Sequence, residues 1–316
     1  MSQHPNPPQY DEPAPSNGMA IASLICGVLG FCLTPVAIVA LILGILAMNK
    51  SRPGQPGRGM AVAGTVLGGV GIAVSIIVLL IAILLPALGA ARRTAQRMQN
   101  STQLRGIHQG MMTFSNSNKN NYPGLNSRGQ ILADDPALTG NSGSGDQPQA
   151  RLWVLLNGSY VTPDYLISPS ESDGAIAAYS GSGPVDKSHY SYALLSFEKT
   201  NTTINDPTTQ GYPATQQSAA RLAEWKQTLN GQAILVSDRN TGTNADTQVQ
   251  SIHTDSPGEW KGSVLWGDNA VMFEMQPTFQ TKYANGGLNN QDNLFLDEPA
   301  SGSNNVAGAN ALMERE

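Results

Sequence analysis

Histidine has the widest choice of chemistry in this 316-residue sequence, because it can act as an acid, a base or a metal ligand near neutral pH. None of the four histidines has a second histidine or a cysteine at metal-ligand spacing; they are His4, His108, His189 and His253. His253 stands near Asp255 and Asp268, a set that could hold a metal weakly or form a polar cluster, but loop and turn positions fit these residues better. His108 falls within a predicted helix, and we expect its side chain to be exposed to solvent.

No other arrangement typical of an active site is found. The glycines cluster in apolar or low-complexity stretches rather than in a phosphate-binding loop, and there is no G-x-S-x-G nucleophile motif. Both cysteines, Cys26 and Cys32, belong to the first apolar stretch, so the chain beyond Leu33 has no disulfide or cysteine–metal framework. The net charge of -5 gives no reason to expect nucleic-acid binding. We therefore expect a protein that is not an enzyme, with no cofactor, no bound metal and no nucleic-acid partner.

Two long apolar stretches dominate residues 18–91. About 20 apolar residues cross a bilayer, so we expect a transmembrane hairpin with helices at about 19–48 and about 59–91. Pro35 should kink or split the first helix. The preceding residues 1–17 are rich in Pro, Gln and Asn, which predicts a disordered tail. The stretch 49–58 contains two prolines, two glycines and three basic residues, and it is expected to form the connecting loop.

The two apolar stretches repeat each other. GMAIASLICGVLG from Gly18 aligns with GMAVAGTVLGGVG from Gly59, with glycines at matching positions. Small residues four apart on a helix share one face and let two helix backbones approach closely in lipid. We therefore predict that the two helices pack through six small residues, which are Ser23, Gly27, Gly30, Gly64, Gly68 and Gly71.

The second apolar helix is expected to continue without a break into a polar one, over residues 92–115. Apolar residues such as Leu104, Ile107 and Met111 recur at helical intervals, which predicts a stripe that packs on a small domain. Basic residues flank the apolar stretches, where contact with phosphate headgroups is the default interpretation; they are Lys50, Arg52, Arg58, Arg92, Arg93 and Arg97.

Residues 92–283 are expected to form an α+β domain in which this helix packs on a small antiparallel sheet. The sheet should fall within residues 151–277, with strands at 191–197 and 232–238 and a short helix at 218–229 between them. Residues 262–274 predict a β-hairpin whose turn contains Asp268 and Asn269. The low-complexity residues 284–316 are predicted to be a flexible tail.

Two resemblances follow from these motifs. Residues 17–80, with NGMAIASLICGVLGF and GRGMAVAGTVLGG, resemble a small two-helix bacterial membrane domain of unknown function. Residues 76–275 resemble a bacterial family of prepilin-like exported proteins, related to type IV pilins and type II secretion pseudopilins. The matching segments are IAILLPALGAARRTAQRMQNSTQLRGI, Tyr122-Pro123, YLISPSESDG with Ser168 at the family's cysteine, SDR at Ser237, and the terminal hairpin. This resemblance implies a half-buried helical spine carrying a small antiparallel sheet, and export from the cytoplasm.

The sequence departs from the pilin pattern at the processing site. Pilins are cleaved after a glycine, and a glutamate stands at the fifth position of the mature chain. Cleavage after Gly64 would place Gly69 there, and cleavage after Gly59 would place Gly64 there. We therefore expect the chain to stay uncut and to keep both predicted membrane helices.

The expected role is structural or assembly-related at the bacterial cell envelope. The alternative is a membrane-tethered binding or sensor module that recognises a glycan or a protein. The expected partners are the lipid bilayer and either further copies of the chain or other envelope proteins. The basic loop 49–58 favours the cytoplasmic side, although the arginines after residue 91 argue the reverse. The polar, cysteine-free domain and the resemblance favour a multi-pass inner-membrane protein with its tail and its large domain both outside the cytoplasm.

Overall fold

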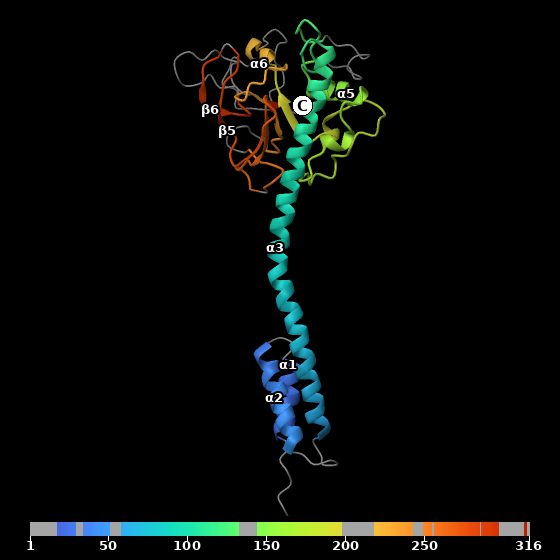
Figure 1. The fold of residues 1–316 in the computed structure, drawn as a ribbon, viewed down its shortest axis with the longest axis vertical. Coiled ribbons are helices and arrows are strands. Elements are labelled where there is room, and N and C mark those ends of the chain that lie inside the picture. The colour runs from blue at the N-terminus through green and yellow to red at the C-terminus, as the bar shows by residue number, and fades with distance from the viewer. Residues whose placement is uncertain are drawn as a thin grey trace, which may run out of the picture. The chain divides into compact units, whose positions relative to one another are not determined.

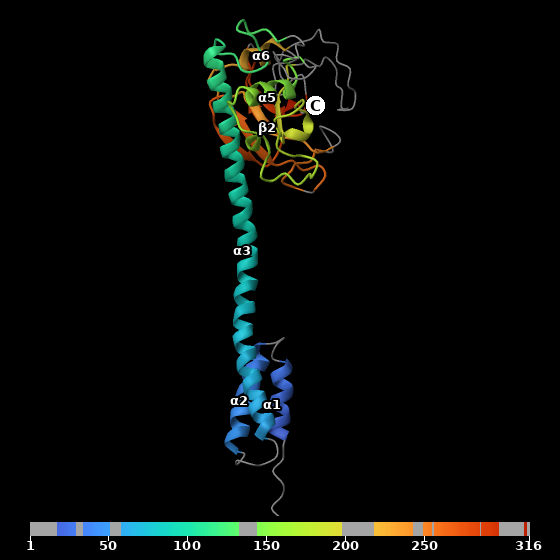
Figure 2. The same ribbon diagram turned by 90° about the vertical axis from the view of Figure 1, so that its right-hand side faces the viewer.

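The computed structural model describes residues 18–29, 34–50, 58–132, 144–197, 218–242, 249–254, 256–284, 286–296 and 313–314. The chain forms two compact units, Met1–Arg92 and Arg93–Glu316. Figures 1 and 2 show the helices of the first unit and the mixed helices and strands of the second. The predicted disordered tail 1–17 lies outside the described residues.

The first unit contains α1 (Gly18–Leu29), α2 (Thr34–Lys50) and the beginning of α3 (Arg58–Ser117). The expected helix at 19–48 is therefore two separate helices. Pro35 is the second residue of α2, where its missing N–H costs no helical hydrogen bond. A proline further inside a helix would remove such a bond, so the chain uses Pro35 to begin a new helix. The structure thus does not show a hairpin of two transmembrane helices.

The predicted long helix is confirmed, because α3 runs through 60 residues. It continues through Pro86 and through the change from apolar to polar sequence. Among the described helices, α3 is the one that is long and apolar enough to cross a membrane.

The second unit is built on a five-stranded antiparallel sheet in the order β4-β3-β2-β1-β7. The strands are β1 (Tyr192–Leu195), β2 (Ile234–Asp238), β3 (Gly262–Trp266), β4 (Val271–Glu274) and β7 (Met313–Glu314). The first two correspond to the predicted strands, and β3 and β4 form the predicted hairpin. Every residue of β1, β2 and β3 is buried, so both faces of the sheet centre are covered.

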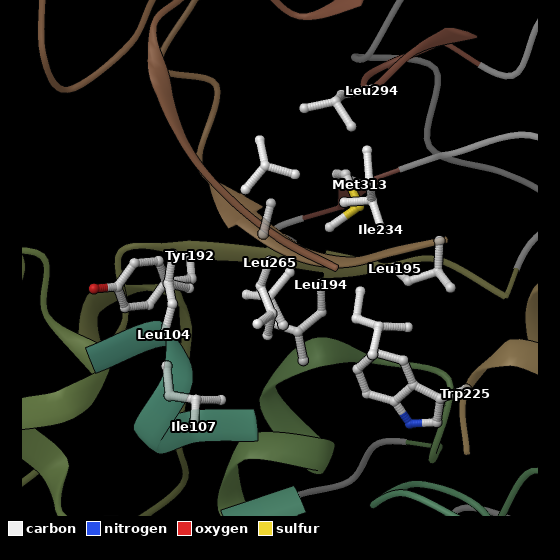
Figure 3. Packing of buried hydrophobic residues seen from close by; sticks show 14 of the residues in the cluster. Leu104, Ile107, Tyr192, Leu194, Leu195, Trp225, Ile234, Leu265, Leu294 and Met313 are labelled. Atoms are coloured by element: carbon white, nitrogen blue, oxygen red, sulfur yellow. The ribbon is translucent and has the colours of Figure 1, made fainter. Parts of the chain in front are cut away.

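Side chains from α3 and from the late part of the chain meet in one core. Leu104, Ile107 and Met111 of α3 belong to it and are at most 1% exposed. Figure 3 shows Leu104 and Ile107 on one side of the strands and Leu294 on the other. The predicted apolar stripe therefore packs on the sheet, as expected.

Short helices complete the second unit. They are α5 (Pro148–Asn157), the 3-10 helices η1 (Pro163–Leu166) and η2 (Lys187–His189), and α6 (Ala219–Glu224). The helix α6 lies within the range predicted for it. Ser218 caps its N-terminus, since the Ser218 hydroxyl accepts a hydrogen bond from the Arg221 N–H at 3.1 Å.

The prediction of a flexible tail over 284–316 is wrong for part of that range. β5 (Thr278–Thr281) pairs with β6 (Asn289–Asn293), and β7 pairs with β1 at the edge of the main sheet. Phe279 and Leu294, in and beside this pair, belong to the core. The strand β6 has the sequence NNQDN, so it lacks the alternation of apolar and polar residues from which strands are predicted. Its pairing with β5 shows that it is a strand.

Candidate functional site

A contact between α1 and α3 brings together two of the predicted packing residues. A Cβ added at Gly64 would clash with the Ser23 hydroxyl oxygen and lie 2.9 Å from the Ser23 carbonyl carbon. Ser23 is fully buried. The two helix backbones approach so closely here that no side chain larger than glycine fits at position 64 without a shift.

A second close contact, which sequence reasoning missed, joins α2 to α3. A Cβ added at Gly44 would lie 3.0 Å from the Thr65 backbone nitrogen and would clash with its hydroxyl. Ala47 and Ala61 form a buried apolar contact one turn away. Ala40, Gly44 and Ala47 follow the same small-residue spacing as the predicted positions, so this spacing was the signal that could have found them.

For the remaining predicted packing residues, the structure describes at most burial or helix membership, and no close contact. Gly68 and Gly71 of α3 are buried. Gly27 belongs to α1, but its surroundings lie outside the described structure, as does Gly30 altogether.

The predicted membrane-interface residues fall into three groups. Arg58, Arg92 and Arg93 are exposed on α3, and Lys50 is the last residue of α2. Arg52 lies outside the described residues. Arg97 packs within the second unit, with its guanidinium carbon 4.1 Å from the centre of the Phe273 ring of β4. A cation over an aromatic face is attracted by the ring's quadrupole, so Arg97 joins α3 to the sheet edge.

Three amide side chains near Arg97 lie at helical spacing on α3 and contact the rest of the second unit; they are Gln96, Asn100 and Gln103. Gln96 donates to the Pro169 carbonyl at 3.0 Å, and Gln103 donates to the Asp164 carbonyl at 2.9 Å. Between them, the Asn100 amide donates to both carboxylate oxygens of Asp238, at 2.9 and 3.0 Å. Sequence reasoning identified none of these contacts.

Asp238 is the centre of this cluster. His253 Nε2 lies 2.8 Å from Asp238 Oδ2, and the Ser263 N–H donates to the same oxygen at 2.6 Å. The Tyr192 hydroxyl lies 2.6 Å from Asn100 Oδ1. Burial, followed by the charge of Asp238, raises the pKa of Tyr192 well above its ordinary value. We call this set the α3 junction; it comprises Gln96, Asn100, Gln103, Tyr192, Asp238, His253 and Ser263.

A buried ion pair lies beside the α3 junction. Arg239 donates to both carboxylate oxygens of Glu171, at 2.9 and 2.7 Å, and its guanidinium lies 3.6 Å from Asp173. Burial alone would raise the pKa of Glu171, but the hydrogen bonds and charge of Arg239, with further hydrogen bonds from Asp173 and Ser191, lower it overall. The pair holds the segment after η1 against the end of β2.

The expectation that His108 lies on the solvated surface is wrong. His108 is fully buried, with Nδ1 3.0 Å from Asn269 Oδ1 and Nε2 2.9 Å from the Tyr122 hydroxyl. Burial lowers its pKa, although Asn269 and Asp268 act in the opposite direction. The helix face that sequence periodicity assigns to solvent is covered by the β3–β4 turn.

That turn holds both predicted turn residues. Asn269 has a φ of 68°, and Asp268 accepts a hydrogen bond from the Ala270 N–H at 2.9 Å. Asp268 therefore does not meet His253, which pairs with Asp238 instead. Asp255 lies outside the described residues.

The contacts of the α3 junction indicate a structural role, because they hold separate segments of the second unit together. The two oxygens of Asp238 accept hydrogen bonds from α3, from β3 and from the segment 249–254. Within the part of the chain that the structure describes, no group of three metal-binding side chains occurs. A buried carboxylate with this many donors holds separate segments in one arrangement.

Comparison with known protein families gives a match that lies in the first unit. A family model described as "Domain of unknown function (DUF4190)" matches residues 19–79, which include α1, α2 and the first part of α3. This match covers less than half of the chain. No curated protein and no solved structure matches the chain.

Proposed function

We propose that this chain is a non-enzymatic bacterial membrane protein in which α3 crosses the inner membrane and carries a pilin-like domain outside the cytoplasm. Its role in this proposal is structural or assembly-related at the cell envelope. The observation that supports it most is the surface of α3 between Ile76 and Leu88.

Ten large apolar side chains are between 48% and 66% exposed in this segment. They are Ile76, Ile77, Val78, Leu79, Leu80, Ile81, Ile83, Leu84, Leu85 and Leu88. Full burial of such a side chain stabilises by about 1.5–3 kcal/mol, so their exposure to water would cost about 10 kcal/mol or more. Residues 76–81 are consecutive and cover every side of the helix, which favours lipid over a single partner helix.

The pilin-like part of the proposal is supported by the second unit. The end of α3 packs on an antiparallel sheet, as the resemblance implies. Two segments that carry the resemblance also meet, since Arg239 of SDR contacts Glu171 of YLISPSESDG. These contacts would hold the end of α3 and the sheet together within the second unit.

Membrane anchoring is tested by a matched pair of charged variants. Leu80→Arg places a charge among the ten apolar side chains, at a residue that is 54% exposed, and Met275→Arg changes a residue of the second unit that is 60% exposed. A charge at the bilayer centre costs about 2.5–3.5 kcal/mol in insertion. We expect Leu80→Arg to reduce the amount of protein in carbonate-washed membranes and Met275→Arg to leave it unchanged. Equal amounts for the two variants would contradict anchoring by this segment.

The structural role is tested by the size of the full-length protein extracted in a mild detergent. A structural or assembly component should sediment as high-order assemblies after crosslinking in the native membrane. A monomer or a small oligomer under the same conditions would contradict that role and favour the membrane-tethered sensor instead.

A further inference from the structure

The direction of α2 relative to α3 follows from their contacts. Leu41 lies against Gly69, Gly44 against Thr65, and Ala47 against Ala61. Residue numbers rise along α2 while those of the partners fall along α3. The two helices are therefore antiparallel, and Lys50 lies at the same end of this packed group as Arg58.

The helix α1 completes a hairpin with α2. The two helices pack side by side, and four residues separate Leu29 from Thr34. So short a connection joins adjoining helices that run in opposite directions. Since α2 is antiparallel to α3, α1 is parallel to α3, and Gly18 lies at the same end as Lys50 and Arg58. Figures 1 and 2 both show α1 and α2 beside the first part of α3.

Neither helix of this hairpin matches the thickness of a bilayer. A rise of 1.5 Å per residue makes the 12 residues of α1 about 18 Å long and the 17 residues of α2 about 26 Å long. The hydrocarbon core is about 30 Å thick and needs about 20 helical residues. A helix that turns back after 12 residues returns to the face from which it entered.

The surface of the three packed helices is suited to lipid rather than to water. Small residues fill the contacts between the helices, namely Ser23, Gly44, Ala47, Ala61 and Gly64. Large apolar side chains face outward on α1 and α2 and are 41–54% exposed. They are Ile21, Ile25, Ile38, Val39, Ile42, Ile45 and Leu46. A helix group in water has the opposite arrangement, with large apolar side chains inside.

We propose that α1 and α2 form a lipid-embedded hairpin that enters and leaves through one face of the membrane, so that α3 alone crosses it. The segment before Gly18 and the connection 51–57 then lie on one side, and the unit Arg93–Glu316 lies on the other. Lys50 and Arg58 favour the cytoplasm for the first side. This arrangement replaces the two-span topology expected from the sequence, in which the tail and the domain share a side.

The proposal rests on the membrane anchoring proposed above, and cysteine labelling in intact cells tests the two separately. In a Cys26→Ala, Cys32→Ala background, single cysteines are introduced by Ser2→Cys, Ser51→Cys and Ser182→Cys. Each full-length variant is treated with a membrane-impermeant maleimide before and after lysis, with any outer membrane permeabilised first. We expect Ser182→Cys to react in intact cells, and Ser2→Cys and Ser51→Cys to react only after lysis.

The other outcomes separate the hairpin from the location of the domain. Reaction of Ser2→Cys together with Ser182→Cys, with Ser51→Cys protected, would show two spans and overturn the hairpin while leaving the domain outside. Reaction of Ser2→Cys and Ser51→Cys with Ser182→Cys protected would keep the hairpin and overturn the extracytoplasmic location. The same behaviour at all three positions would place the two ends of α3 on one side and overturn the proposal that α3 crosses the membrane.

Discussion

Asn100 of α3 and Asp238 of β2 lie 138 residues apart in the sequence, and the Asn100 amide donates to both carboxylate oxygens of Asp238. The same amide lies 2.9 Å from the Ser263 hydroxyl of β3. One side chain therefore connects the long helix to two neighbouring strands. Because Asp238 is fully buried, the loss of these donors cannot be compensated by bulk water.

Replacement of Asn100 should therefore loosen the second unit. Asn100→Leu keeps the branched shape of the side chain but removes both hydrogen bonds to Asp238, and we expect it to lower the free energy of unfolding by about 3 kcal/mol. Gln99→Leu is the matched control, since Gln99 is exposed on the same helix. Urea unfolding of the detergent-solubilised chain, followed by tryptophan fluorescence, reports on this unit because all four tryptophans lie in it. Equal unfolding midpoints for the two variants would contradict the α3 junction.

The Glu171–Arg239 pair should contribute stability that depends on pH. The folded pKa of Glu171 is lowered, so its contribution is fully present above the unfolded value of about 4.3 and is lost as pH falls through the folded value. Glu171→Gln should destabilise by about 3 kcal/mol at pH 7, because it leaves Arg239 without its buried partner.

The control for this pair is Asp173→Asn. Asp173 is 49% exposed and lies 3.6 Å from Arg239, so its loss should cost less than about 1 kcal/mol. Thermal unfolding between pH 3 and pH 7 distinguishes the two carboxylates. A Glu171→Gln curve that stays parallel to the wild-type curve down to pH 3 would show that the pair does not stabilise the fold.

His108 should make the second unit less stable in mild acid. Burial lowers its folded pKa, so between that value and the unfolded value of about 6.5 the unfolded chain binds more protons than the folded chain. Stability is therefore full above about pH 6.5 and falls as pH is lowered below it. His108→Gln retains a polar side chain without this titration, so its unfolding midpoint should vary less between pH 5 and pH 7. An unchanged slope would exclude His108 as a source of the dependence.

The contacts between the first helices predict a contrast among three glycines of the first unit. Gly64→Leu and Gly44→Leu should push the helices apart, because an added Cβ already clashes with Ser23 or Thr65. Gly59→Leu should be tolerated, because nothing lies within 4 Å of its added Cβ. Packing contacts in lipid contribute about 1–2 kcal/mol, so the effect should appear as a lower thermal midpoint in detergent. A loss of stability for Gly59→Leu as large as that for Gly64→Leu would contradict these contacts.

The features that the sequence predicted well depend on local or periodic signals. The long helix carries a continuous apolar stretch and then apolar residues at helical spacing, and α3 follows both. The strands β1 and β2 are short apolar runs between turn-forming residues, and the hairpin turn contains Asn269 at a positive φ. Such signals require no knowledge of distant contacts.

The features that were missed depend on partners far along the chain. His108 is polar and lies on a helix, so only the β3–β4 turn, more than 150 residues later, shows that it is buried. Asp238 has no local signal that distinguishes it from an exposed strand end, because its donors come from α3, β3 and the segment 249–254. The hairpin of α1 and α2 depends on whether Pro35 kinks one helix or begins a second one, and hydropathy alone does not decide between the two.

We propose that this chain remains an uncut membrane protein whose α3 stays joined to α1 and α2, unlike a processed pilin. Mass determination of the native protein's N-terminus, after purification from washed membranes, tests it most directly. We expect the second unit to be recovered covalently attached to α1 and α2. A mature chain that begins at Met60 or Thr65 would contradict it.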